Sequence, residues 1–193
     1  IWVWSRMDRE REIMASPEYQ SLLPHRVAMG YPENTKPEYT ILTHAKIDFL
    51  SHVIDQNISN SKFLVWLDFG YLSPRAMSNS KPNASLDTAK MSEGMVTICC
   101  LNGGLSMQDA DIIYTLKNAP EKLAGGLFLG DRASLKQFQQ ICHEWLIRYQ
   151  SMNIADDEQA MWIQCIFQNP SLFYLHVFSG WHDSLKYFTR ASV

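Results

Sequence analysis

An aspartate stands directly after a short apolar run, where its carboxylate could bind a metal ion. Residues 63–67 carry no charged side chain and are followed by Asp68 and then, in an expected turn, by Gly70. Ligands of open α/β sheets bind beyond the carboxyl ends of strands, and carboxylate oxygens bridge Mg²⁺ or Mn²⁺ to nucleotide phosphates. The pattern therefore predicts a metal and phosphate position at Asp68. An aspartate that only caps a turn is the alternative.

Three carboxylates follow one another at the expected start of a helix, in Asp156-Asp157-Glu158-Gln159. Asp156 and Gln159 have the spacing of a capping box, and the helix dipole favours negative charge at this end. Capping leaves Asp157 and Glu158 unexplained. Facing a cleft, such acids act as a general base or orient a sugar hydroxyl, so we predict a catalytic role for at least one of them.

Three basic side chains are further candidates. His176 lies inside an apolar segment, which favours a hydrogen-bonded core histidine over a ligand. His182 follows a Gly-Trp pair in an expected loop, where imidazole could bind a metal or a diphosphate. Lys46 lies in an expected helix that leads toward the Asp68 strand and could neutralise phosphate. A solvated lysine is the alternative.

The elements that must position these groups alternate between helices and strands, which is typical of α/β architecture. Expected strands are Phe63 to Leu67, Met95 to Leu101, Leu123 to Leu129 and Leu172 to Phe178. Expected helices are Met7 to Leu23 with a break at Ser16-Pro17, Tyr39 to Gln56, a helix capped by Asp131, and Asp156 to Phe167.

Several segments carry more specific expectations. The unbroken apolar run of residues 63–67 predicts a strand buried on both faces, and Gly125-Gly126 inside another run indicates a bulge or a close approach. Residues 31–39, with two prolines, read as an extended loop, and residues 73–93 as a surface loop or lid. Residues 109–116 could form either a strand or a helix.

Composition restricts the class of protein. The formal charge of -3 and the lack of a basic run disfavour a nucleic-acid partner. Four cysteines without CxxC spacing favour buried free thiols, and no apolar stretch reaches the roughly twenty residues of a membrane span. The chain starts at Ile1 without a signal-peptide pattern, so we expect a cytoplasmic fragment of a longer protein that forms one domain over residues 1–193.

An ordered series of segments resembles the HtrL/YibB family, bacterial and viral relatives of glycosyltransferases associated with surface-polysaccharide assembly. The matching pieces are Tyr31-Pro32-Glu33, Pro37-Glu38-Tyr39, Lys46, Val65 to Tyr71, Ala124 to Gly130, Asp156 to Gln159 and Asn169 to Phe173. The resemblance implies a GT-A-like (Rossmann-like) mixed sheet flanked by helices, a nucleotide-sugar donor, a glycan acceptor, and Mn²⁺ or Mg²⁺.

The same resemblance implies roles for single residues. Asp68 takes the place of the Asp-x-Asp motif on the metal and diphosphate, and Gly70 stands where the second acid would be. Gly125 and Gly126 would line the sugar and acceptor side, the Asp157-Glu158 pair would approach the transferred sugar, and His182 would complete metal binding. The family's first strand and base-binding segment lie upstream of the matched region.

Three functions are therefore in view. The first is transfer of a sugar from a nucleotide donor to a glycan acceptor, with Asp157 or Glu158 as the acid-base or sugar-orienting group. The second is a glycan-binding or scaffold domain that kept this fold without the reaction. The third is a helical interaction module, which requires Trp145 and Tyr149 to be exposed.

Overall fold

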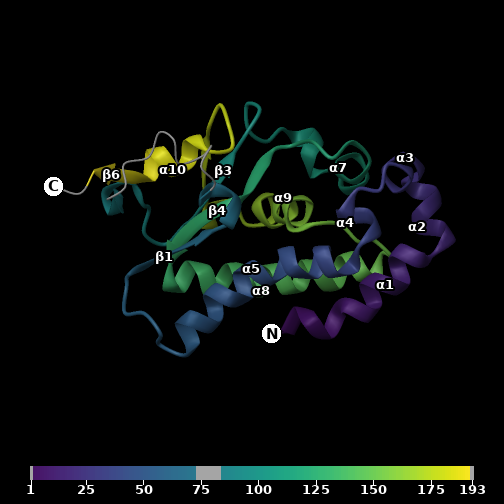
Figure 1. The fold of residues 1–193 in the computed structure, drawn as a ribbon, viewed down its shortest axis with the longest axis horizontal. Helices are drawn as coiled ribbons and strands as arrows, with labels where there is room; N and C mark the ends of the chain where they lie inside the picture. The colour runs from purple at the N-terminus through teal and green to yellow at the C-terminus, as the bar shows by residue number, and fades with distance from the viewer. Residues whose placement is uncertain (1, 73–83, 192–193) are drawn as a thin grey trace.

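The protein is built around a four-stranded mixed sheet that packs against a layer of helices (Figure 1). The computed structural model describes residues 2–72 and 84–191. The strands are β1 (Phe63–Leu67), β2 (Ala84–Leu86), β3 (Val96–Cys100), β4 (Leu123–Asp131), β5 (Phe173–Val177) and β6 (Thr189–Ala191). The α-helices are α1 (Met7–Ala15), α2 (Pro17–Leu22), α3 (Pro24–Ala28), α4 (Pro32–Thr35), α5 (Pro37–Asp55), α7 (Ile112–Asn118), α8 (Arg132–Ser151), α9 (Glu158–Gln168) and α10 (Asp183–Phe188). Short 3-10 helices are η1 (Trp2–Arg6), η2 (Phe69–Leu72), η3 (Thr88–Lys90), η4 (Met107–Ala110) and η5 (Pro170–Leu172).

The sheet order is β1-β4-β3-β5, in which β4 runs antiparallel to β1 and β3 while β3 and β5 are parallel. Successive side chains of a strand point to opposite faces, so Ile98 packs into the helical layer while Cys99 packs toward α10. On the helical side, Phe128, Phe138 and Trp162 are buried and meet edge to face. The expected α/β class, with a mixed sheet flanked by helices, is confirmed.

The long helices lie close to where the local sequence patterns predicted them. The helix expected at residues 39–56 is α5, and the predicted break after residue 15 separates α1 from α2. Asp131 caps α8 as expected, because its Oδ1 accepts the backbone N–H of Ser134 at 2.9 Å. All four cysteines are buried and free, which confirms the prediction made for them.

Two predictions about the first half of the chain are wrong. Strand β1 is not buried on both faces: Leu64 is its one buried residue, because β1 lies at an edge of the sheet and pairs with β4. Residues 31–39 do not form an extended loop. Pro32 and Pro37 are each the first residue of a helix, where the fixed φ of proline suits the helix and its missing N–H costs nothing.

Two further expectations concern residues 73–93 and residues 109–116. Residues 109–116 are helical, since they contain the end of η4 and most of α7. Of the expected loop at residues 73–93, residues 73–83 lie outside the described residues, and the remainder contains β2, which pairs with β6 about a hundred residues later. None of the helices in residues 2–72 and 84–191 has both the length and the apolar character needed to cross a lipid bilayer.

The hypothesis of an interaction surface on α8 is wrong. Tyr149 is 2% exposed, and its hydroxyl donates a hydrogen bond to the Ala160 carbonyl at 3.2 Å. Trp145 is half-buried and packs edge to face against Tyr149. These rings therefore belong to the contact between α8 and α9.

Candidate functional site

Lys46 lies at the centre of a buried polar cluster and binds three elements to α5. Its Nζ donates to Asp68 Oδ2 at 3.0 Å, to the Gly125 carbonyl at 3.2 Å and to Glu158 Oε1 at 2.7 Å. Its three N–H donors thus have three acceptors. The residue is 8% exposed, so the alternative of a solvated surface lysine is wrong.

The charge of Lys46 is fixed by its partners. Burial alone would lower the pKa of its ammonium, but the carboxylates of Glu158 and Asp68 outweigh burial and raise that pKa. Lys46 is therefore charged at neutral pH. A phosphate could reach it only by displacing one of its present acceptors.

Asp68 sits at the carboxyl end of β1, as predicted, and its side chain is 35% exposed. Its backbone N–H continues the ladder to the Gly126 carbonyl at 2.8 Å. Trp66, on the same strand, donates its indole N–H to Asp68 Oδ1 at 2.6 Å. Both carboxylate oxygens of Asp68 are thus held by protein donors, while part of the group faces solvent.

Gly125 lies where β4 breaks its pairing with β3. Ile98 pairs with Phe128 and Cys100 with Leu123, so four residues of β4 oppose a single residue of β3. The predicted bulge at this glycine pair is confirmed. A Cβ on Gly125 would lie 2.2 Å from Glu158 Oε1, which is an impossible contact. The close approach expected here is therefore to the Glu158 side chain.

The substitution Gly125→Ala is expected to destabilise the protein by about 1–3 kcal/mol, because Glu158 must move away from Lys46 to admit the methyl group. Urea unfolding followed by circular dichroism measures the effect. Gly70→Ala is the matched control, since nothing lies within 4 Å of its Cβ position. Equal stability of the two variants would contradict this reading of Gly125.

The described residues do not fit a divalent-metal site. They contain no group of three or more His, Cys, Asp or Glu side chains that could hold a metal ion. The Lys46 ammonium, 3.0 Å from Asp68, also opposes a second cation at this carboxylate. His182 directly precedes α10 and is half-buried. Binding of Mn²⁺ or Mg²⁺ by Asp68 and His182 stays a prediction.

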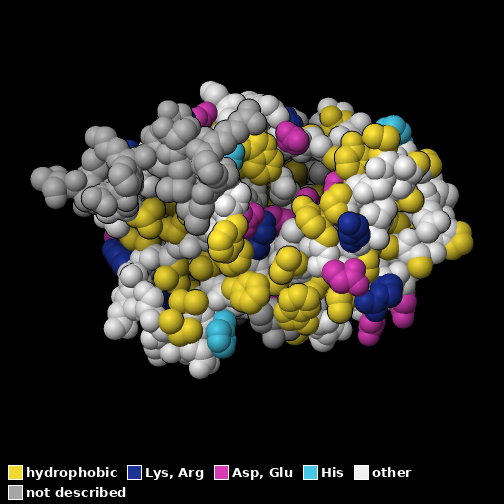
Figure 2. Space-filling view, in the orientation of Figure 1, with side chains coloured by type: hydrophobic (Ala, Val, Ile, Leu, Met, Phe, Trp, Pro, Cys, Tyr) yellow, Lys and Arg dark blue, Asp and Glu magenta, His cyan; other side chains and the backbone are white. Residues whose placement is uncertain are grey.

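A pocket of about 490 Å³ opens beside this cluster. Figure 2 shows this face of the molecule hollowed, with acidic side chains inside the hollow and hydrophobic ones around it. The pocket is lined by His25, Arg26, Tyr31, Glu33, Tyr39, Thr115, Lys117, Asn118, Ala119, Pro120, Glu121, Asp156, Asp157, Gln159, Ala160, Ile163 and Trp181. Its walls thus come from α3, α4, α5, α7, α9 and the segments that flank them, together with Trp181 from the segment before α10.

The two predicted catalytic acids, Asp157 and Glu158, have different environments in the structure. Asp157 lines the pocket, and its Oδ1 caps α9 by accepting the backbone N–H of Gln159 at 3.0 Å and of Ala160 at 3.4 Å. Asp157 rather than Asp156 is therefore the cap. Glu158 is 1% exposed, and its Oε2 has no hydrogen-bond partner among the described residues. Of the two acids, Asp157 can reach a ligand in the pocket.

Burial and neighbouring carboxylates raise the pKa of Asp157, with Glu158 and Asp156 as the nearest negative charges. Burial likewise raises the pKa of Asp156 to about 7, although Arg26 opposes the shift. Carboxyl groups with pKa values near neutrality are suited to exchange protons at physiological pH. The pKa of Asp157 is raised as well, and this residue lines the pocket.

Arg26 is the functional residue that sequence reasoning missed. It is 5% exposed and donates to Glu33 Oε1 at 2.8 Å and to the Leu116 carbonyl at 2.6 Å, with Asp156 Oδ2 at 3.5 Å. It therefore joins α3, α4, α7 and the start of α9 at one wall of the pocket. A single arginine in a short helix gives no sequence signal for this.

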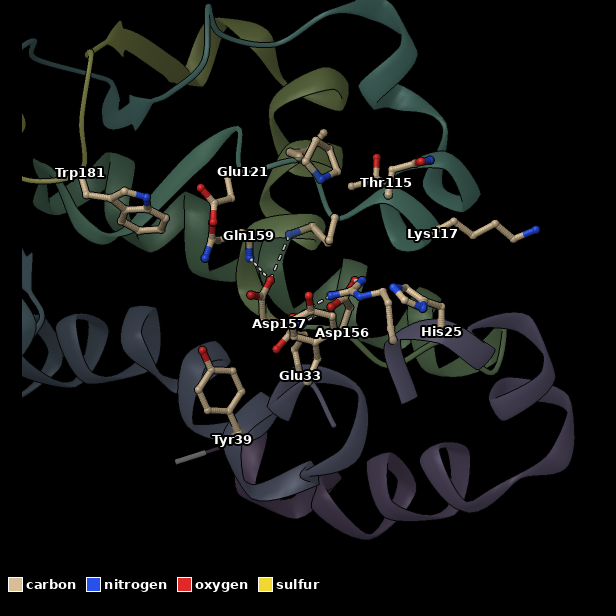
Figure 3. A pocket seen from close by; sticks show the side chains of 17 residues that line it. His25, Glu33, Tyr39, Thr115, Lys117, Glu121, Asp156, Asp157, Gln159 and Trp181 are labelled. Atoms are coloured by element: carbon tan, nitrogen blue, oxygen red, sulfur yellow. Dashed lines mark hydrogen bonds and ion pairs between the residues drawn. The ribbon is translucent and has the colours of Figure 1, made fainter. Parts of the chain in front are cut away.

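Tyr39 of the pocket wall lies in one of the matched segments, where it had no assigned role. Tyr39 is 39% exposed, and burial of its hydroxyl, followed by the charges of Asp157 and Glu158, raises its pKa to about 12. It therefore stays neutral. Figure 3 shows that Tyr39, Trp181 and Asp157 line the same pocket. The prolines at helix starts were the available signal for Tyr39, because they fix where α5 begins.

The remaining candidates lie outside the pocket lining. Gly70 is exposed within η2, and Gly126 contributes its carbonyl to the Asp68 backbone. His176 is half-buried and stacks on Phe178, with ring centroids 4.4 Å apart, so it belongs to the aromatic packing above the sheet. Lys46, Asp68, Gly125 and Glu158 are the predicted residues that the fold brings into contact.

Fold and site together define a mixed α/β domain in which a buried lysine-carboxylate cluster adjoins a polar, aromatic pocket. The chain belongs to the HtrL_YibB family, whose model is described as "Bacterial protein of unknown function (HtrL_YibB)" and matches residues 9–190. It is similar to Protein HtrL of Escherichia coli (strain K12), with 23% identity over 164 residues that cover 81% of this chain and 55% of that protein. The chain thus spans about half the length of this relative. No solved structure matches the chain significantly.

Proposed function

We propose that this domain has a GT-A-like fold and takes part in glycosyl transfer from a nucleotide-sugar donor to a glycan acceptor, with the sugar-binding pocket in front of Asp157. The observation that carries the proposal is the pocket lining, which combines carboxylates, an amide and aromatic rings. Carboxylates and amides hydrogen-bond to sugar hydroxyls, and ring faces pack on the apolar faces of sugars.

The size of the pocket supports the same proposal. Small-molecule sites occupy about 300–1,000 Å³, and the pocket volume of about 490 Å³ lies within this range. Tyr31, Tyr39 and Trp181 supply the ring faces, and Asp157 and Gln159 supply polar groups from one helix start. A site of this size accommodates one or two sugar residues.

In the proposed step, an acceptor hydroxyl oxygen attacks the anomeric carbon of the donor sugar. The bond from that carbon to the diphosphate oxygen breaks, and the nucleoside diphosphate leaves with the electron pair. The proton of the hydroxyl passes to the Asp157 carboxylate. Lys46 contributes as a positioning residue, because it holds Asp68, Gly125 and Glu158 together behind the pocket wall.

A turnover assay tests the proposal. The protein is incubated with UDP-, GDP- and CMP-sugars, with and without oligosaccharide acceptors, and the released nucleotide is quantified. Asp157→Asn is expected to reduce turnover about 10²–10⁴-fold, because asparagine keeps the helix cap but cannot accept the proton. Glu144→Gln, an exposed substitution on α8, should leave turnover unchanged. Equal rates for wild type and Asp157→Asn would contradict the role of Asp157. The same assay with a chelator and with added Mn²⁺ tests the predicted metal assistance.

A glycan-binding domain without catalysis is the second candidate. The observation that favours it is the lack of a metal-binding group among the described residues, next to a pocket whose lining suits sugars. Sugar binding to the pure protein, without release of nucleotide from any donor, would support this candidate over the first.

A further inference from the structure

The pocket lining contains more acidic side chains than permanently cationic ones. Its lining includes four carboxylates, Glu33, Glu121, Asp156 and Asp157, against the permanent cations Arg26 and Lys117. Arg26 is already engaged, because its guanidinium contacts Glu33 at 2.8 Å and Asp156 at 3.5 Å. Figure 3 shows the Lys117 side chain extending away from Asp157. Neither Asp157 nor Glu121 has an ion-pair partner within the described part of the chain.

The charged groups behind the pocket wall do not supply the positive charge that the acidic side chains of the lining lack. Glu158 is fully buried next to Asp157, and its one cation, Lys46, is shared with Asp68. Water is largely excluded around Asp157 and Glu158. This exclusion strengthens the interaction of an unpaired carboxylate with any cation that enters the pocket. The raised pKa of Asp157, caused by burial and then by the carboxylates of Glu158 and Asp156, is consistent with a missing positive charge.

Aromatic rings border the same space. Figure 3 shows the labelled side chains of Tyr39, Gln159, Glu121 and Trp181 around the side of the pocket that contains the Asp157 carboxylate. The faces of Trp and Tyr attract ammonium groups by about 0.5–2 kcal/mol. Carboxylates and ring faces around one space form a recognition site for an organic cation.

The acidic composition of the lining also indicates which substrate the pocket receives. A donor sugar carries a diphosphate on its anomeric oxygen, and the acidic walls would repel this group. An acceptor residue carries no such charge, and its attacking hydroxyl must lie near the base. The pocket therefore suits the acceptor.

We propose that the pocket binds a glycan acceptor whose terminal sugar carries a protonated amino group, which lies between Asp157 and Glu121 and against the rings of Tyr39 and Trp181. This inference rests on the proposed function. The ammonium supplies the positive charge that the wall lacks, and it keeps the Asp157 carboxylate ionised and able to accept the proton of the acceptor hydroxyl.

Binding of four monosaccharides, measured by NMR titration of the whole chain at neutral pH, tests the proposal. Glucosamine is the cationic probe, glucose and N-acetylglucosamine are neutral, and glucuronic acid is anionic. Glucosamine is expected to bind at least about tenfold more tightly than either neutral sugar, and glucuronic acid more weakly than glucose. Raising the pH above the pKa of the amino group should remove the preference for glucosamine.

Variants locate the site. Asp157→Asn retains the cap of α9 and therefore the fold, and Glu121→Gln changes an exposed residue. Each should reduce the preference for glucosamine, whereas Glu144→Gln should keep it. Equal binding of glucose and glucosamine to wild type would overturn the amino-sugar inference and leave the sugar pocket intact. Failure of all four sugars to bind would overturn the amino-sugar inference and the assignment of this pocket to sugars. Glycosyl transfer by the domain is tested independently, by nucleotide release in the turnover assay.

Discussion

Replacing Lys46 with methionine is expected to lower the free energy of unfolding by about 3–5 kcal/mol. The substitution removes the donor from three acceptors and leaves the Glu158 carboxylate, 1% exposed, without a cation among the described residues. Methionine is similar in length to lysine, so lost packing contributes little. Urea unfolding, followed by circular dichroism at neutral pH, measures the effect.

The matched control is Lys136→Met on α8. Lys136 pairs with Asp55 at 2.9 Å, and both side chains are more than a third exposed, so its loss should cost about 0–1 kcal/mol. Adding Glu158→Leu to Lys46→Met should restore roughly half of the lost stability, because the uncompensated buried charge is then gone. A cost for Lys46→Met no larger than that for Lys136→Met would show that the cluster is not important for the fold.

A second large effect concerns the pH dependence of stability and originates at Glu10 on α1. Glu10 is 1% exposed, and burial raises its pKa from 4.5 to about 7, although Gln150 donates to its Oε1 at 2.6 Å. Between these pH values the unfolded chain loses the proton while the folded protein keeps it. Stability therefore falls as the pH rises through this window and levels off above pH 7, by up to roughly 3 kcal/mol for this one group.

Glu10→Gln removes this titration and keeps an oxygen to accept from Gln150. The variant is expected to be more stable than wild type at pH 8, by up to roughly 3 kcal/mol, and to show a smaller slope of stability against pH. Some slope remains, because burial also raises the pKa of Asp156 to about 7. Glu12→Gln, on the same helix with a side chain 67% exposed, is the control. Parallel stability curves for wild type and Glu10→Gln would contradict the assignment.

Sequence reasoning named four residues that the fold joins, Lys46, Asp68, Gly125 and Glu158, but it gave their partners incorrectly or not at all. It placed Asp68 after a strand and Gly125 at a bulge, because both signals are local. It expected phosphate at Lys46, where the structure places three protein acceptors. The resemblance to HtrL/YibB proteins supplied the residues, and the family match over residues 9–190 confirms that relationship.

The pocket could not be predicted in the same way. Arg26 carries no motif, and its contacts with Leu116 and Asp156 join segments 90 or more residues away in the chain. The choice between Asp157 and Glu158 also required the fold. Adjacent residues at a helix start point in different directions, and only packing against β4 and α5 shows that Glu158 turns inward while Asp157 lines the pocket.

The sequence by itself determined the α/β class, the long helices and the aspartates after β1 and before α8, because helix periodicity, apolar runs and caps are local properties. Only the tertiary structure decided what Lys46 does. Its acceptors lie 22, 79 and 112 residues away along the chain. Because all three accept hydrogen bonds from one buried ammonium, Lys46, expected to bind phosphate, holds the site together.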